Sequence, residues 1–266
     1  MICINVCGLT SKIATPEFIE TLNNYDIVCL TETKTDKADI IDIPNFHVYC
    51  KHRSQLSFRR SGGIVVYIRD TLAKFCSIIS NDCDHVLWVK IEGKTFGIND
   101  HLLIGTVYIP PSNSRFSSIE IFEDLENEIY YLSTEYICFC LVGDFNSRVS
   151  TLKDFTDYDE NFEQTCNPMT DIDFSFAVDQ VDVKSLESLG FSIVRNSKDK
   201  TVNQYGKRLI DVCRHCNIFI LNGRSKSDYN GECTCKQTSV VDYCISNVDF
   251  LRYVQDVKIL PYSMFL

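Results

Sequence analysis

Short apolar runs separated by polar stretches dominate this chain, and the period of the apolar residues predicts its elements. Continuous apolar runs of this length, bounded by turn residues, are typical of buried strands. The runs predicted as strands occupy residues 2–4, 27–30, 64–68, 86–91, 102–109, 137–142, 218–221, 239–245 and 257–260.

Helical spacing appears between several of these runs. Pro16 follows Thr15 and suits the first position of a helix, which ends near residue 23. The sequence Ser117-Ser118-Ile119-Glu120 has the form of a capping box, followed by apolar residues at helical spacing. A third helix is predicted around 205–216. Interleaved helices, strands and hairpin-like pairs predict mixed sheets covered by helices, in one layered α/β domain spanning residues 1–266.

Composition narrows the partners that the chain can bind. Its 266 residues are 45% hydrophobic, which supports a large core, and 26 basic against 36 acidic residues give a net charge of −10. Such a chain is not a general polyanion binder, so nucleic acid must meet a local basic patch or a bound cation. The densest positive charge lies at Lys51, Arg53, Arg59 and Arg60; this stretch is either a solvated loop or a nucleic-acid contact. Residues 151–185 are acidic and weakly periodic, as in a surface excursion.

Fourteen cysteines are spread along the chain, many of them inside the predicted strands. Buried free thiols are common in proteins of reducing compartments, so we expect an intracellular protein, nuclear or cytoplasmic. The start of the chain lacks the features of a signal peptide, and no apolar run reaches membrane-spanning length. The cysteines at 213, 216, 233 and 235 could form a zinc site, but a core helix and a strand are the favoured interpretation, so no zinc is expected.

Polar residues lie at the ends of several predicted strands. After the run 137–142, Gly143 allows a close turn, and Asp144 and Asn146 then point to one side with Phe145 on the other. A carboxylate here can take a proton from water and an amide can hold a phosphate oxygen, although an Asx turn has the same composition. The other such residues are Asn5, Glu32, Tyr108 and Asp242. Strand ends of this kind carry ligand sites in α/β sheets, and an oxygen-rich set suits Mg²⁺.

Six motifs, in order, resemble the endonuclease/exonuclease/phosphatase superfamily, which includes deoxyribonuclease-I-like enzymes. They are "INVCGL", "CLTET", "SGGIVVYIRD", "VYIPP", "LVGDFNS" and "SVVDYCIS". The sequences "NQYGKRLIDVC" and "FILNGR" are similar to the endonuclease domains of non-LTR retrotransposons. The resemblance spans nearly the whole chain. It implies a four-layer sandwich in which two mixed sheets lie face to face with helices outside.

The resemblance also implies roles. Glu32 and Asn5 would bind Mg²⁺, with Mn²⁺ as an alternative, and Asp144 would activate water. Asn146 and Tyr108 would contact phosphate, and Asp242 would orient a catalytic histidine. The implied protein is a monomeric hydrolase that acts on DNA. Taken singly, Glu32 is better explained as an ordinary loop acid, and the ordered set of motifs favours a ligand. Tyr108 could equally be a core residue.

The sequence departs from the family pattern at its end. No Ser-Asp-His occurs, and all five histidines precede Asp242. We therefore expect an open reading frame truncated before that motif, without the last strand, whose nuclease activity is weakened or absent. The alternatives are a catalytically dead remnant that binds nucleic acid, and a phosphatase or phospholipase on the same fold.

Overall fold

Two mixed β-sheets form the centre of the molecule. The computed structural model describes residues 1–53, 60–81, 83–156 and 182–261. The first sheet has the order β1-β2-β4-β3 and the second β5-β6-β7-β8-β10-β9. The pairs β1/β2 and β7/β8 are parallel and all other pairs are antiparallel. The strands are β1 (Ile2–Asn5), β2 (Ile27–Thr31), β3 (Phe46–Lys51), β4 (Ile64–Arg69), β5 (Cys76–Ile79), β6 (Val86–Ile91), β7 (Leu102–Tyr108), β8 (Cys138–Asp144), β9 (Phe219–Ile220) and β10 (Asp242–Ser246).

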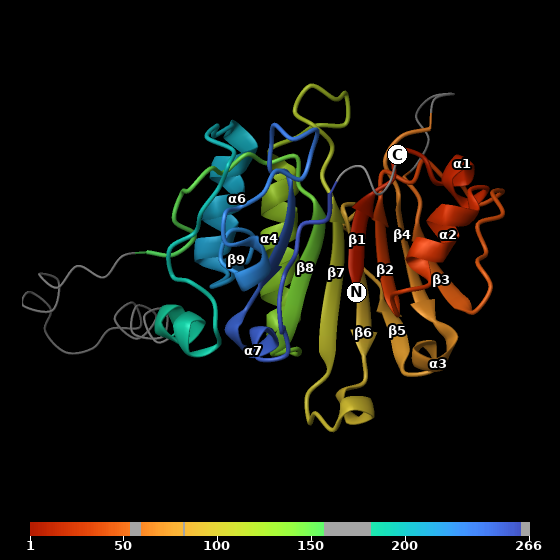
Figure 1. Cartoon of the computed structure of the whole chain (residues 1–266), viewed down its shortest axis with the longest axis horizontal. Coiled ribbons are helices and arrows are strands. Elements are labelled where there is room, and N and C mark those ends of the chain that lie inside the picture. Colours follow the sequence, from red (N-terminus) through yellow and green to blue (C-terminus); the bar gives the residue numbers. More distant parts are fainter. Residues whose placement is uncertain (54–59, 82, 157–181, 262–266) are drawn as a thin grey trace, which may run out of the picture.

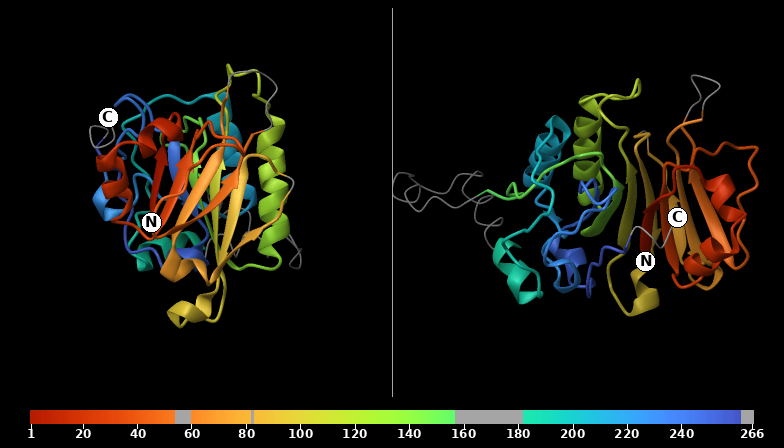
Figure 2. Two further views of the ribbon diagram at one scale, coloured as in Figure 1. Left: turned by 90° about the vertical axis from the view of Figure 1, so that its right-hand side faces the viewer. Right: turned by 45° about the horizontal axis from the view of Figure 1, so that its top comes forward.

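Helices cover the outer face of each sheet, which gives four layers (Figure 1). Helices α1 (Leu9–Ile13) and α2 (Pro16–Leu22) pack on the first sheet, and α4 (Glu120–Ser133) and α6 (Gln204–His215) pack on the second. The inner faces meet in a separate apolar cluster that includes Val66, Val89 and Val142. Figure 2 shows the same layers from two further sides. The predicted α/β sandwich of two mixed sheets flanked by helices is confirmed.

Short helices complete the described part of the chain. They are α3 (Asp70–Ala73), α7 (Val248–Leu251) and the 3₁₀ helices η1 (Gly93–Phe96) and η2 (Lys226–Asp228), and residues 182–188 are helical as well. Among the described residues, no helix combines the length and the apolar composition needed to cross a membrane.

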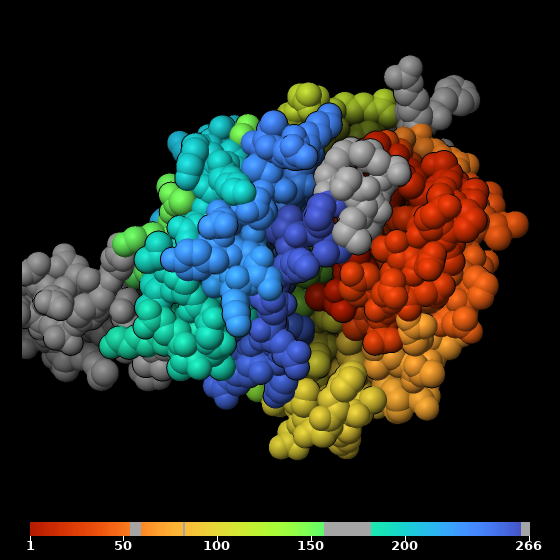
Figure 3. All heavy atoms as spheres, in the orientation of Figure 1, coloured from red at the N-terminus to blue at the C-terminus, as the bar shows by residue number. Residues whose placement is uncertain are grey.

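Several local predictions differ from the structure. Residues 257–260 are not a strand; this segment is extended, and Leu260 packs against the cluster beneath α1 and α2. On the face shown in Figure 3, this last segment (blue) lies beside the first residues of the chain (red). Strand β3 was missed because its half-buried positions mix polar with apolar residues. The capping box does not form, since α4 begins after Ile119 and Ser118 Oγ instead accepts from the Glu120 N–H.

The cysteines that the structure describes are free thiols. Several lie between the sheets, and burial raises the pKa of Cys140 and Cys29, the latter to about 11. They act there as small apolar residues. Cys213 lies in the core on α6. Cys235 lies in a tight turn, paired with Ser239, rather than in the strand expected there.

Candidate functional site

Three of the predicted site residues form one row across adjacent strands of the second sheet. In the strand register, Asp144 at the end of β8 lies opposite Tyr108 of β7 on one side and Asp242 of β10 on the other. Asn5, at the end of β1 in the first sheet, donates from Nδ2 to Asp144 Oδ2 over 2.8 Å. The two sheets therefore meet at this point through side chains that the sequence analysis had singled out.

Glu32 lies at the same end of the sheets, directly after β2. Its backbone is in the left-handed region with φ 54°, a conformation that is uncommon outside glycine and collects at functional sites. Its carbonyl accepts from the Gly8 N–H over 2.9 Å, which fixes the turn. The charge of Glu32 raises the pKa of both Tyr108 and Asp144, after the larger effect of burial. Lys34 Nζ lies 3.2 Å from Glu32 Oε1, so the carboxylate already attracts one cation.

Asn146 is also left-handed, with φ 48°. Its backbone N–H donates to Asp144 Oδ1 over 2.9 Å, which is the Asx turn that the sequence allowed. Its side-chain Nδ2 donates to the Ile109 carbonyl over 2.8 Å. An amide group has two N–H donors, so one remains for a ligand. Phe145 points into the core on the other side, as the alternation predicted.

Two neighbouring carboxyl groups give the site its unusual electrostatics. Asp144 is buried, and burial, followed by the charge of Asp242, raises its pKa, although hydrogen bonds from the Asn146 N–H and the Asn5 side chain oppose the shift. Burial also raises the pKa of Asp242 to about 6, against a hydrogen bond from Thr234. Like charges so close resist joint ionisation. A bound cation would favour ionisation of both groups.

Oxygen atoms of the kind that a hard divalent cation binds lie at this end of the sheets. Glu32, Asp144 and Asp242 supply carboxylates, and the side-chain oxygen of Asn5 supplies a neutral ligand. In the described part of the chain, no group of three or more Asp, Glu, His or Cys side chains is already arranged around a common point. Mg²⁺ is usually held by one or two carboxylates with several waters, so a sparse set of this kind suits it.

The turn after β8 is fixed by close backbone packing. Gly143 has φ 151°, and a Cβ atom there would lie 1.9 Å from the Val107 carbonyl oxygen. Asn203 caps α6: its Oδ1 accepts from the N–H groups of Gly206 and Arg148, over 2.6 and 2.9 Å. Its Nδ2 donates to the Asn146 carbonyl over 3.2 Å. The N-terminus of α6 therefore holds the turn that carries Asn146.

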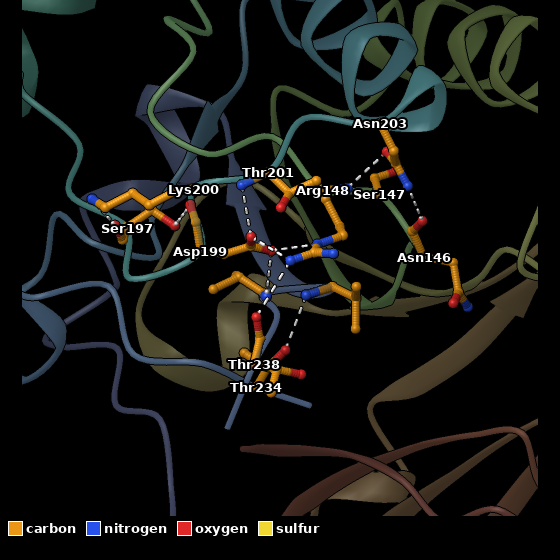
Figure 4. Close-up of polar contacts among 12 residues, drawn as sticks. Asn146, Ser147, Arg148, Ser197, Asp199, Lys200, Thr201, Asn203, Thr234 and Thr238 are labelled. Atoms are coloured by element: carbon orange, nitrogen blue, oxygen red, sulfur yellow. Dashed lines mark hydrogen bonds and ion pairs between the residues drawn. The ribbon is translucent and has the colours of Figure 1, made fainter. Parts of the chain in front are cut away.

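An ion pair between half-buried Arg148 and buried Asp199 joins the same turn to the segment before β10 (Figure 4). Asp199 accepts from Arg148 Nε and Nη2 over 2.8 and 2.7 Å, and from the backbone N–H groups of Thr201 and Val240. Thr234 Oγ1 accepts from the backbone N–H groups of Val241 and Asp242. Sequence reasoning missed Arg148 and Asp199. Asn203 had a signal, since an asparagine three residues before Gly206 at a helix start is an N-cap pattern.

The predicted basic contacts are dispersed rather than gathered. Lys51 Nζ donates to Asn81 Oδ1 and to the carbonyls of Cys83 and Val86, so it supports the fold. Arg60 is paired with Asp36 and Asp39. Arg59 lies outside the described residues. Arg53 alone lies at the site, with its Cζ 5.2 Å from the centroid of the Tyr108 ring.

Comparisons with known proteins show the family and the fold of the chain. The model of the Endonuclease/Exonuclease/phosphatase family matches residues 4–228. A comparison with curated proteins found no match. Among solved structures, the endonuclease domain of TRAS1, a telomere-specific non-LTR retrotransposon, has a TM-score of 0.52 at 13% identity, covering 94% of this chain and 84% of that one.

Two further structures share the fold. The catalytic domain of Xenopus laevis APE2 has a TM-score of 0.55 at 13% identity, covering 94% of this chain and 82% of that one. The 3′ phosphatase NExo from Neisseria, bound to a product DNA hairpin, has a TM-score of 0.50 at 13% identity, covering 96% and 89%. Identities this low show similarity of fold, and the family assignment rests on the match over residues 4–228. The chain belongs to the Endonuclease/Exonuclease/phosphatase family.

Proposed function

We propose that this chain is a Mg²⁺-dependent phosphodiester hydrolase of nuclease type that acts on DNA. The observation that carries the proposal is the row of Tyr108, Asp144 and Asp242, joined to the other sheet by the hydrogen bond between Asn5 and Asp144. The NExo structure contains DNA, which supports nucleic acid as the substrate class.

Asp144 is the proposed base that takes a proton from the attacking water. A base works best when its pKa approaches the working pH, and the pKa of Asp144 is raised from the usual range of an aspartate. Hydrogen bonds from Asn5 and from the Asn146 N–H orient both of its oxygens. The carboxylate is therefore held in one position by donors on each side.

Asn146 and Tyr108 are the proposed phosphate contacts. Each can donate a hydrogen bond, and donors fixed before the reaction stabilise developing charge most effectively. The bond from Asn146 to Ile109 fixes the amide, and burial raises the pKa of Tyr108, which keeps its hydroxyl protonated. Glu32 and Asn5 would hold Mg²⁺, which when bound would neutralise charge on the phosphate.

A plasmid-nicking assay tests the assignment of Asp144. We expect Asp144→Asn to reduce the rate of nicking of supercoiled plasmid with Mg²⁺ by about 10²–10⁴-fold, the usual contribution of a positioned base. The matched control is Asp100→Asn, since Asp100 is an exposed acid in the loop between β6 and β7. Equal rates for wild type and Asp144→Asn would refute the role of Asp144.

Metal binding has a test that does not depend on turnover. Calorimetry of the wild-type chain should show weak Mg²⁺ binding that Glu32→Ala abolishes and Asp100→Asn leaves intact. Binding that survives Glu32→Ala would contradict the assignment of Glu32. The expectation of weakened activity stays a prediction, and nicking by these 266 residues can be compared with nicking by the same chain extended with a Ser-Asp-His strand.

A further inference from the structure

Arg53 is held in place by contacts on several sides. Its Cζ lies 5.2 Å from the centroid of the Tyr108 ring and 5.0 Å from that of Phe116. A Cβ atom added to Gly62, whose φ is 68°, would lie 2.7 Å from the same Cζ. The guanidinium thus lies against two aromatic rings and the backbone of Gly62, which has no side chain. A group fixed in this way loses little conformational freedom when it binds a ligand.

Arg53 differs from the other arginines near the sheet ends because it is half-buried without a carboxylate partner. Among the described residues it forms no ion pair, whereas Arg60, Arg69 and Arg148 each contact an aspartate. Glu32 and Asp84 act on its charge only from a longer range. A partly buried charge is costly unless it is paired. An anionic ligand would supply the missing partner.

A second guanidinium lies beside the first. Arg115, which is exposed, has its Cζ 4.6 Å from the centroid of the Phe116 ring. Both arginine side chains therefore lie against the Phe116 ring, and Arg53 also contacts the Tyr108 ring at the site. In a chain of net charge −10 this is a local concentration of positive charge next to proposed phosphate-binding groups.

We propose that Arg53, Phe116 and Arg115 form a subsite for one backbone phosphate of the substrate strand, next to the phosphate that is cleaved. This inference rests on the proposed function and adds a second phosphate-binding position to the proposed site. Arg53 lies against the ring of Tyr108, which is itself a proposed contact of the cleaved phosphate. A phosphate bound by Arg53 would therefore be a neighbour of the cleaved one along the strand. Guanidinium groups bind phosphate oxygens with two parallel hydrogen bonds.

Binding measured without metal tests the subsite separately from catalysis. Fluorescence anisotropy with a labelled DNA duplex in EDTA, over a range of salt concentrations, gives the affinity and its salt dependence. Arg53→Gln should weaken binding by roughly 10–100-fold, as expected for lost charge-assisted hydrogen bonds. The slope of log K against log salt should decrease in magnitude by about 0.9, the value for one phosphate contact on a duplex. Arg115→Gln, at an exposed position, should change both in the same direction.

The matched control is Arg69→Gln. Arg69 also lies over an aromatic ring, Phe46, but it is paired with Asp26 at the far end of β4. Its removal takes away the same charge and should leave the salt slope unchanged. Arg53→Lys keeps the charge but not the planar geometry and should fall between wild type and Arg53→Gln.

A modified duplex identifies the phosphate. Replacing the phosphate next to the cleaved one by an uncharged methylphosphonate should weaken binding by wild type and have little further effect on Arg53→Gln. Equal affinities and slopes for wild type, Arg53→Gln and Arg115→Gln, with circular dichroism showing folded proteins, would overturn the subsite. If nicking still depends on Asp144 in that case, the proposed function holds and only the subsite is wrong. A wild-type chain that binds no DNA would overturn the subsite, and one that also nicks none would overturn both.

Discussion

The ion pair between Asp199 and Arg148 should stabilise the fold and the site together, and Asp199→Asn tests this. The Asp199 side chain is completely buried and accepts four hydrogen bonds, two of them from Arg148. An asparagine has the same shape but only one acceptor oxygen. Its NH₂ group would face donors that Asp199 now satisfies, either Arg148 Nε and the Val240 N–H or Arg148 Nη2 and the Thr201 N–H.

The magnitude follows from the burial of the two partners. Breaking a fully buried pair costs about 3–5 kcal/mol. Arg148 keeps 32% of its side chain exposed, so water replaces part of what it loses. We therefore expect a loss of about 2–3 kcal/mol in the free energy of unfolding, or roughly 4–6 °C in Tm for a chain of this size.

Thermal unfolding followed by circular dichroism measures the effect, with Lys198→Gln as the control. Lys198 is adjacent in sequence and pairs with Glu232, but both side chains are exposed, so its loss should change stability by about 0.5 kcal/mol or less. A Tm for Asp199→Asn equal to that of the control would refute the reasoning.

The dependence on pH gives a second check. Burial alone would raise the pKa of Asp199, but its bonds to Arg148, Thr201 and Val240 lower it overall. A lowered pKa means stability that is present above the usual aspartate range, near pH 4, and is lost as the pH falls through the folded-state value. The difference between wild type and Asp199→Asn should therefore shrink below about pH 4. A difference that stays constant into strong acid would mean that the charge of Asp199 contributes nothing.

Two further predictions concern charged groups inside the fold. The pKa of Asp242 is raised to about 6, so its contribution to stability is present at low pH and is lost as the pH rises from the usual aspartate range to that value. The metal-free chain should show a falling Tm between about pH 4 and 6 that Asp242→Asn flattens, and an unchanged slope in that variant would contradict this. Lys51→Met removes the donor of three hydrogen bonds and should lower the free energy of unfolding by about 2–3 kcal/mol, with little effect on DNA affinity. Unchanged stability together with weaker DNA binding would instead support Lys51 as a nucleic-acid contact.

The arrangement of the fold was predictable where each strand carries its own signal. Runs such as 86–91 are apolar at almost every position, because a strand between two packed layers has no polar face, and β6 occupies that range. Strands β3 and β5 lie at the edges of their sheets. Most positions of β3 are half-buried or exposed, and no position of β5 is fully buried, so neither strand has the apolar run of a buried strand. The other two edge strands, β1 and β9, are more buried and were predicted, so exposure of a strand rather than its place at an edge decides whether the pattern detects it.

The local sequence pattern marked the proposed site residues individually. It did not mark the residues that hold them in position. Asn5, Glu32 and Asp144 each follow an apolar run within two residues, so local pattern is enough to mark them. The bond from Arg148 to Asp199 spans 51 positions of the sequence. Nothing in the neighbourhood of either residue distinguishes this pair from an exposed one. The same holds for the basic stretch, where charge density marked Lys51, Arg53 and Arg60 alike, while tertiary packing gave them three different environments.

The pairing of Asp144 with Asp242 shows how topology creates the chemistry of the site. Asp144 is the last residue of β8 and Asp242 is the first residue of β10. Because these strands are antiparallel neighbours, the end of one lies beside the beginning of the other. Two carboxyl groups that are almost a hundred residues apart are thereby held side by side in a poorly solvated place, where each resists ionisation of the other. A parallel pairing of the same strands would have put Asp242 at the opposite end of the sheet. The raised pKa of the proposed base therefore follows from strand direction as much as from the residues themselves.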